Sequence, residues 1–238
     1  MVEIPDYGAD FLDMWEELLL LAREPPAPWT LIGAHMVALH GWARDRHDFR
    51  PSRDADVLVN VRVVADGTVK VGGCLHDRGF ELDGISPEGV GHRFVKKNVR
   101  IDILAPDGTG GRTNFFTLAG ARTIAVPGGS QALKRSRMVE LRARGLSGTV
   151  PVPDLLGALL IKIRAIAVDD QPEAQRRDVA FLLSLVDDPE PLISDLLESE
   201  RRWLRRHPYF ADPGSDCYQE MASAADAATA FRRIAALP

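Results

Sequence analysis

The 238-residue chain has the composition of an ordinary folded protein, with 45% hydrophobic and 26% charged residues, which excludes the disordered and fibrous classes. The formal net charge of -5 excludes a global field that attracts nucleic acid, so any such contact requires a local basic patch. The two cysteines, Cys74 and Cys217, belong to no CxxC or Cys/His cluster, and we expect neither a disulfide framework nor a zinc site.

The N-terminal stretch is acidic and lacks the basic and apolar regions of a signal peptide. No apolar run approaches the roughly 20 residues that span a bilayer. We therefore expect a cytoplasmic protein with no membrane partner. The length fits one large domain or two small ones.

The first part of the chain predicts a helix, a short strand and a second helix. Residues 9–23 place apolar side chains at helical spacing, and two prolines end the pattern. Residues 29–32 form an apolar run that ends at Gly33, and residues 34–40 then predict a short helix. This unit is a strand, a glycine turn and a helix. The polar stretch 42–53 has no periodicity and predicts an exposed loop.

Two later strands are expected to bring acidic residues to one face. Residues 54–61 alternate, so that their apolar side chains share one face while Asp54 and Asp56 lie on the other. After a glycine-interrupted helix, residues 92–104 predict a hairpin, and its second strand places Asp102 opposite the apolar side chains. We expect these three carboxylates to meet on one face of a sheet.

The character of the chain changes near residue 150. Residues 105–114 predict a turn-rich loop and residues 121–128 a further short strand. From Asp154, a predicted N-cap, the signals are helical, with helices expected at 155–167, 173–186, 190–206 and 216–236. The order of elements predicts a mixed α/β fold, divided into an α/β domain over 1–150 and a helical domain over 151–238.

The three aspartates are of the residue type that holds magnesium. Carboxylates are the hard oxygen ligands that Mg²⁺ prefers, and magnesium neutralises phosphate charge while an alcohol oxygen attacks. A DxD pair alone is common, but Asp54 and Asp56 open a strand whose other face is apolar, after a strand-glycine-helix unit. For Asp102 an ion pair with Arg100 or Lys96 is the alternative.

The order LIGAHMVALHG, RPSRDADVLV and VRIDILAP resembles the signature of the DNA polymerase β-type nucleotidyltransferase superfamily. The later sequence PVPDLLGALLIKIRAIAVDDQPEAQRRDVAFLLSL is similar to the helical segment of the AbiEii/AbiGii toxin-like members. The resemblance covers roughly residues 28–186 and implies a nucleotidyltransferase fold with a C-terminal helical domain.

The resemblance also implies roles for particular residues. Asp54, Asp56 and Asp102 are expected to be catalytic metal ligands for Mg²⁺. Lys162 is expected to bind the triphosphate or to act in catalysis, and Asp178 is a candidate base. The residues implied at the nucleotide are Gly33, Ala34, Ser52, Arg53 and Lys162.

One departure from the family pattern concerns the turn. Members usually carry Gly-Gly or Gly-Ser there, whereas this chain has Gly33 and Ala34, and the loop before the DxD strand is longer. A missing hydroxyl or second glycine removes a phosphate contact or backbone freedom. Ser52 lies where toxin-like members often have Ser or Thr, and we expect it to compensate.

Helical periodicity tests the later residues independently of the resemblance. Lys162 and Asp178 both have leucines at helical spacing on their own helices, so both charges are expected to point partly inward. Inward charges need partners. A triphosphate would serve Lys162 and a cation Asp178; the alternative is that the two pair with each other.

Two basic runs, residues 134–144 and the RRWLRR segment 201–206, are candidates for contact with RNA, with Trp203 available for stacking on a base. The alternative is that both are solvated helix faces.

These patterns together predict an enzyme that moves a nucleotide from a nucleoside triphosphate to an acceptor hydroxyl. If the toxin-like resemblance extends to role, the acceptor is tRNA or another translation component and a cognate antitoxin restrains the enzyme. Transfer to a small molecule such as an aminoglycoside is one alternative. A non-catalytic member that binds a nucleotide is the other, and Ala34 favours it.

Overall fold

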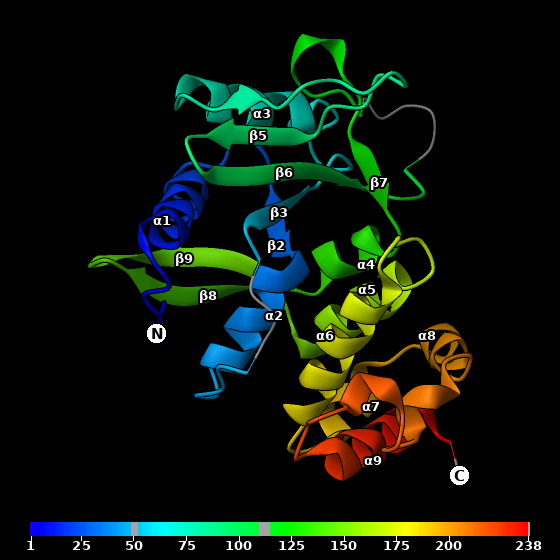
Figure 1. Ribbon diagram of the computed structural model, residues 1–238. Coiled ribbons are helices and arrows are strands. Elements are labelled where there is room, and N and C mark those ends of the chain that lie inside the picture. Colours follow the sequence, from blue (N-terminus) through cyan, green and yellow to red (C-terminus); the bar gives the residue numbers. More distant parts are fainter. Residues whose placement is uncertain (49–51, 110–114, 238) are drawn as a thin grey trace.

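The structure, a computed structural model, describes residues 1–48, 52–109 and 115–237 (Figure 1). Its strands are β1 Val2–Glu3, β2 Trp29–Ile32, β3 Asp54–Val59, β4 Glu81–Leu82, β5 Arg93–Lys96, β6 Val99–Pro106, β7 Ile124–Val126, β8 Ser136–Ala143 and β9 Leu146–Pro153. Its α-helices are α1 Ala9–Arg23, α2 Gly33–Trp42, α3 Gly67–Asp77, α4 Gly129–Lys134, α5 Leu155–Ala165, α6 Pro172–Ser184, α7 Glu190–Asp195, α8 Glu198–Leu204 and α9 Ala224–Ala235. Short 3-10 helices lie at Leu118–Gly120, Pro208–Ala211 and Asp216–Tyr218.

The fold is mixed α/β, as expected from the order of elements. The helix predicted over 9–23 is α1, and the predicted strand-glycine-helix unit is β2 followed by α2. The DxD strand is β3, and the predicted hairpin is β5 and β6. Part of the predicted loops, residues 49–51 and 110–114, lies outside the described residues.

The main sheet has the strand order β2-β3-β6-β5-β4, with β7 pairing the far end of β6. β3 runs antiparallel to β2 and parallel to β6, and β5 runs antiparallel to β6. In this register Asp54 lies opposite Arg100, and Asp56 lies opposite Asp102. Because side chains alternate along a strand, all three aspartates lie on the same face of the sheet.

A second sheet, with the order β1-β8-β9, is absent from the expectations above. The basic stretch 134–144 was interpreted as a charge run, but most of it is β8. Its sequence alternates at the C-terminal end, where Leu141 and Ala143 are buried, whereas Met138 and Glu140, which precede them, are exposed. Two prolines in β9 obscure that strand, and they are tolerated because β9 is an edge strand of this sheet.

Helix α1 packs against both sheets and supplies much of the core between them. Trp15 and Leu18 are fully buried, as are Leu31 of β2 and Ile101 of β6. Burying one such side chain stabilises the fold by roughly 1.5–3 kcal/mol. This core fixes the relative positions of β2, β3 and β6. The face of the main sheet that bears Asp54, Asp56 and Asp102, on β3 and β6, is the acidic face.

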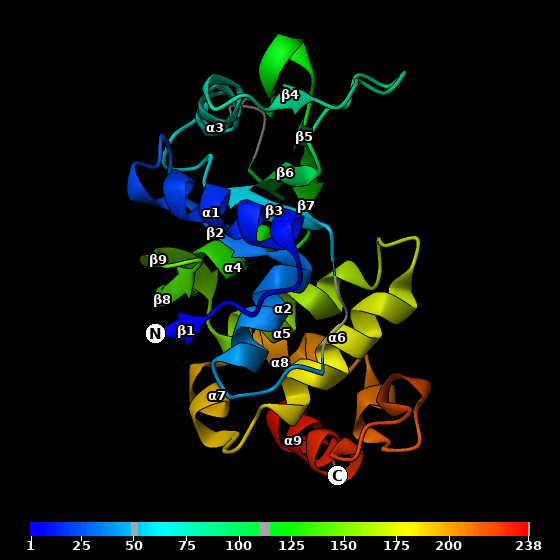
Figure 2. The same cartoon turned by 60° about the vertical axis from the view of Figure 1, so that its left-hand side comes forward.

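From Leu155 onward the described elements are all helices. Asp154 caps α5, because its carboxylate accepts a hydrogen bond from the Gly157 backbone N–H at 2.8 Å. α6 packs on α5, on α2 and on α9, and both ribbon views place α7 and α9 at the end of the molecule away from α3 (Figures 1 and 2). The division of the chain at residue 150, which falls within β9, stays a prediction. None of the helices in the described part of the chain has the length and apolar character needed to cross a membrane.

Candidate active site

The three predicted aspartates lie together where β3 and β6 run side by side. Asp56 and Asp102 are register partners, and Asp54 stands two residues before Asp56 on the same face. Asp102 is buried at 5% exposure, whereas Asp54 and Asp56 are half-buried. The strand phase read from the sequence therefore brings these side chains to one place.

Arg93 of β5 is a member of this site that the sequence analysis did not name. Its Nε and Nη2 atoms donate to the two carboxylate oxygens of Asp102, each at 2.9 Å, and Nη2 also donates to Asp54 Oδ2 at 3.0 Å. The hairpin register, which sets Arg93 opposite Asp102, is the signal that would have found it. Arg93 thus links two of the three carboxylates, and the pairing raises the pKa of its guanidinium.

The partners expected as alternatives for Asp102 lie elsewhere. Arg100 is 3.7 Å from Asp54 Oδ1, and Lys96 pairs with Glu17 on α1 at 2.8 Å. His92 Nε2 lies 3.7 Å from Asp102 Oδ2. Asp102 therefore forms an ion pair, but its partner is Arg93, and neither Arg100 nor Lys96.

Gly33 begins α2 directly against the Asp56 carboxylate. Its φ is +73°, a left-handed conformation that favours glycine, and a Cβ at this position would overlap Asp56 Oδ2. The requirement at position 33 is therefore steric, in addition to being conformational. Ala34 follows as a buried residue in the first turn of the helix.

Asp56 differs electrostatically from its two neighbours. Burial, with smaller contributions from the charges of Asp102 and Asp54, raises the pKa of Asp56 from 3.8 to about 7, although the charges of Lys162 and Arg93 oppose the increase. With the residues that the structure describes, Asp56 forms neither a hydrogen bond nor an ion pair. The site therefore holds a carboxylate whose negative charge has no direct counterion.

The donor chemistry of the site suits a magnesium ion, since all three side chains offer hard oxygen ligands. Among the described residues, Asp54 Oδ1 is buried and accepts no hydrogen bond, and Asp56 has no direct counterion. No group of three His, Cys, Asp or Glu side chains in the described ranges has a geometry ready to hold a metal ion. The residues fit the ion in type and charge, and the structure has them in an arginine-bound arrangement.

Lys162 and Asp178 are buried and paired with each other. Lys162 Nζ lies 2.8 Å from Asp178 Oδ2 and 3.0 Å from Gln175 Oε1, and the two charged side chains are only 5% and 4% exposed. The inward orientation predicted from helical spacing is confirmed, and so is the alternative of a mutual ion pair. The positive charge of Lys162 also lowers the pKa of Asp56, so it contributes to the electrostatics of the acidic face.

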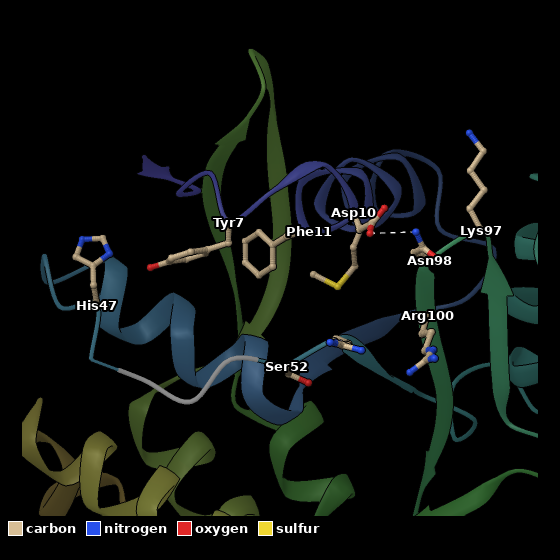
Figure 3. A pocket seen from close by; sticks show the side chains of 10 residues that line it. Tyr7, Asp10, Phe11, His47, Ser52, Lys97, Asn98 and Arg100 are labelled. Atoms are coloured by element: carbon tan, nitrogen blue, oxygen red, sulfur yellow. Dashed lines mark hydrogen bonds between the residues drawn. The ribbon is translucent and has the colours of Figure 1, made fainter.

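An open cavity of about 770 Å³ is lined by Ser52 and Arg53, which lead into Asp54, and by Arg100, the register partner of Asp54 (Figure 3). Its lining comes from the start of α1, from the segment before β3, and from the β5–β6 hairpin. Ser52 and Arg53 belong to this lining. The Asp54 backbone N–H donates to Ser52 Oγ at 3.3 Å, so Ser52 shapes the entry into β3, and Arg53 is exposed. The structure therefore places these two predicted nucleotide contacts at the cavity.

The two basic runs are largely engaged within the protein. In the first run, Arg135 pairs with Glu200 at 3.2 Å, and Arg142 pairs with Glu3 at 3.1 Å. In the second run, the ring of Trp203 is covered by the Arg164 guanidinium, 4.8 Å from the ring centroid. These contacts reduce what either run offers to a nucleic acid.

Comparisons with known proteins give one distant likeness. No protein-family model matches the chain, and no curated protein matches it. Among solved structures, the chain is similar to the crystal structure of an antigenic nucleotidyltransferase-like protein from Paracoccidioides brasiliensis, with 13% sequence identity, a TM-score of 0.47, and coverage of 92% of this chain and 91% of that chain. At this identity and TM-score the likeness assigns neither a family nor an activity.

Proposed function

We propose that this protein is a nucleotidyltransferase, which moves a nucleotide from a nucleoside triphosphate to an acceptor hydroxyl and releases pyrophosphate. The observation that carries the proposal is the acidic face, where Asp54, Asp56 and Asp102 lie together beside the glycine that starts α2. Carboxylates clustered on one sheet face next to a helix start suit phosphate chemistry, because both a metal ion and the helix N-terminus favour negative charge.

Asp54, Asp56 and Asp102 would hold magnesium in this proposal. Bound there, the ion would supply charge neutralisation at the reacting phosphate. Asp56 has no ion-pair partner among the described residues, and this supports the assignment, since a cation would offset the burial and the charge repulsion that raise its pKa to about 7.

Other residues of the chain bind and orient. Lys162 contributes positive charge toward the acidic face, and its pairing with Asp178 and Gln175 holds the ammonium group in place. Asp178 acts in this scheme by positioning Lys162, and its role as a base stays a prediction. Gly33 allows the backbone at the start of α2 to approach Asp56 closely.

The charge of the cavity lining favours one class of candidate acceptor over the other. The cavity beside Asp54 is lined by the cationic side chains of Arg53, Lys97 and Arg100 and by one carboxylate, Asp10. Aminoglycosides are polycations, which such a lining repels, whereas an anionic acceptor is attracted. We therefore favour an anionic acceptor such as tRNA over an aminoglycoside. A role in a toxin-antitoxin pair stays a prediction from the sequence resemblance.

A second candidate function is non-catalytic nucleotide binding. The hydrogen bonds from Arg93 to Asp102 and Asp54 favour it, because they occupy two of the carboxylates that a metal ion needs. Calorimetry with Mg²⁺ and each nucleoside triphosphate, run beside a turnover assay, separates the two. Binding without turnover supports the non-catalytic reading.

The deciding experiment for catalysis is transfer of label from radioactive nucleoside triphosphates to a pool of cellular RNA. We expect transfer by the wild-type protein and its loss in Asp56→Asn, which keeps the size of the side chain and removes its charge. The matched control is Asp226→Asn, which changes an exposed aspartate on α9 far from the acidic face and should keep the wild-type rate. Transfer retained in Asp56→Asn contradicts the proposal.

A further inference from the structure

The cavity beside Asp54 combines an aromatic surface with positive charge. Tyr7 is 52% exposed, and its ring meets Phe11 edge to face, with 5.2 Å between the ring centroids. Lys97 lies in the turn of the β5–β6 hairpin, away from Tyr7 (Figure 3). Arg53, which also lines the cavity, directly precedes β3. A volume of about 770 Å³ is within the range that holds ligands of nucleotide size and above.

Two cationic side chains of this cavity lack the ion pairs that engage several arginines elsewhere in the described part of the chain. Arg53 and Lys97 are exposed, and neither has a hydrogen bond or ion pair with a described residue. By contrast, Arg142 and Arg144 in β8 and the turn after it pair with acidic side chains of the protein. Among the described lining residues the carboxylate is that of Asp10, which accepts a hydrogen bond from Asn98 at 3.1 Å. The cavity therefore presents cations that are available to an external anion.

The cavity also has a defined position relative to the acidic face. Ser52 and Arg53 lead directly into Asp54, and Arg100 is its register partner and lies 3.7 Å from its carboxylate. Gly33 and the charge of Lys162 act on Asp56, further along β3. Along β3, Asp54 therefore lies toward the cavity, and Asp56 lies toward Gly33 at the start of α2.

We infer that this cavity binds a single-stranded segment of the acceptor nucleic acid, with a base stacked on Tyr7 and backbone phosphates near Arg53 and Lys97. That the bound nucleic acid is the acceptor rests on the proposed function, whereas the binding of a single strand is argued from the cavity lining alone. Aromatic stacking with flanking cations recognises single strands, because every base has a face to stack and every linkage a charge. A duplex keeps its bases stacked inside and cannot use Tyr7 in this way.

The test measures the affinity for a fluorescein-labelled single-stranded RNA of ten nucleotides by fluorescence anisotropy, with EDTA present and no triphosphate. We expect the double variant Arg53→Gln/Lys97→Gln to weaken binding by about tenfold in Kd and to lower the slope of log Kd against log salt by about 1.4, or 0.7 for each phosphate contact. Tyr7→Ala should weaken binding by about tenfold while leaving the salt slope unchanged.

The matched control is Arg23→Gln/Lys70→Gln, which removes the same charge from two exposed positions outside both the cavity and the two basic runs. This variant should bind RNA as the wild type does, and thermal unfolding should show all variants folded. Equal losses in the cavity and control variants would overturn the inference, because binding would then follow net charge alone. A cavity variant with unchanged Kd, or a duplex of the same length that binds as tightly as the single strand, would also overturn it.

The same variants distinguish this inference from the proposed function. If the wild type transfers label to RNA while the cavity variants bind RNA normally, the proposed function stands and the site is wrong. If the wild type transfers no label but the cavity variants lose RNA, the site stands and the protein is a binding protein.

Discussion

Replacing Asp56 with asparagine is expected to stabilise the protein at neutral and alkaline pH. Burial, together with Asp102 and Asp54, raises the pKa of Asp56 from 3.8 to about 7 in the folded protein. The folded state therefore binds a proton more tightly than the unfolded chain does. Wild-type stability should fall as the pH rises from about 4 to about 7, and it should stay low above that range. Asparagine carries no charge, so the variant does not suffer this loss.

The size of the effect follows from the shift in pKa. Each pKa unit corresponds to about 1.4 kcal/mol, so the change from 3.8 to about 7 gives an upper limit of about 4 kcal/mol. Asp56 is half-buried, and water screens part of the repulsion, so we expect roughly 2 kcal/mol at pH 8. The gain should be smallest near pH 4, where Asp56 is protonated in the folded wild-type protein and about half protonated in the unfolded chain.

The measurement is urea unfolding of both proteins between pH 4 and pH 8 with EDTA present. The matched variant is Asp102→Asn, which removes the ion pair with Arg93 and should destabilise the protein by about 1–3 kcal/mol. The two substitutions should therefore change the free energy of unfolding in opposite directions, although both remove a carboxylate from the same site. An Asp56→Asn protein that is no more stable than the wild type at pH 8, or a gain that does not change with pH, would refute it.

Two further substitutions test the surroundings of the site by the same urea method. Gly33→Ala should destabilise the protein by about 2 kcal/mol or more, since φ is +73° and the new methyl group overlaps Asp56. The control Gly73→Ala, which has open space around it in α3, should instead stabilise the protein by about 0.5–1 kcal/mol. Equal effects of the two substitutions would contradict the steric argument. Lys162→Met should cost about 3 kcal/mol, because it removes the ammonium group that pairs with the buried Asp178 carboxylate. A loss below about 1 kcal/mol would show that this ion pair contributes little to stability.

The sequence by itself determined the elements that carry the acidic face. Helical spacing gave the bounds of α1, and the run before Gly33 gave β2 and α2. The alternation in β3 placed Asp54 and Asp56 on one face, and the hairpin pattern added Asp102. These features are local, because the period of a helix or strand is set by a few neighbouring residues.

Only the tertiary structure decided how the charges of the site are paired. Arg93 lies nine residues before Asp102 and thirty-nine after Asp54, and its contact with both depends on β3 and β5 flanking β6. From the sequence, the expected partners of Asp102 are Arg100 or Lys96, because strand pairing over long separations leaves no periodic signal. For the same reason the second sheet, in which β1 joins β8 from the other end of the α/β part, was not predicted.

The buried pair of Lys162 and Asp178 lies between these two cases. Periodicity determined that both charges point inward, since each helix has an apolar stripe beside them. Their 2.8 Å contact required the packing of α6 on α5, which depends on side chains sixteen residues apart and on the whole helical part. The cavity beside Asp54 likewise exists only because α1, the segment before β3 and the β5–β6 hairpin meet in space. Sequence thus fixes which residues share a face, whereas packing decides which charges on those faces meet a partner.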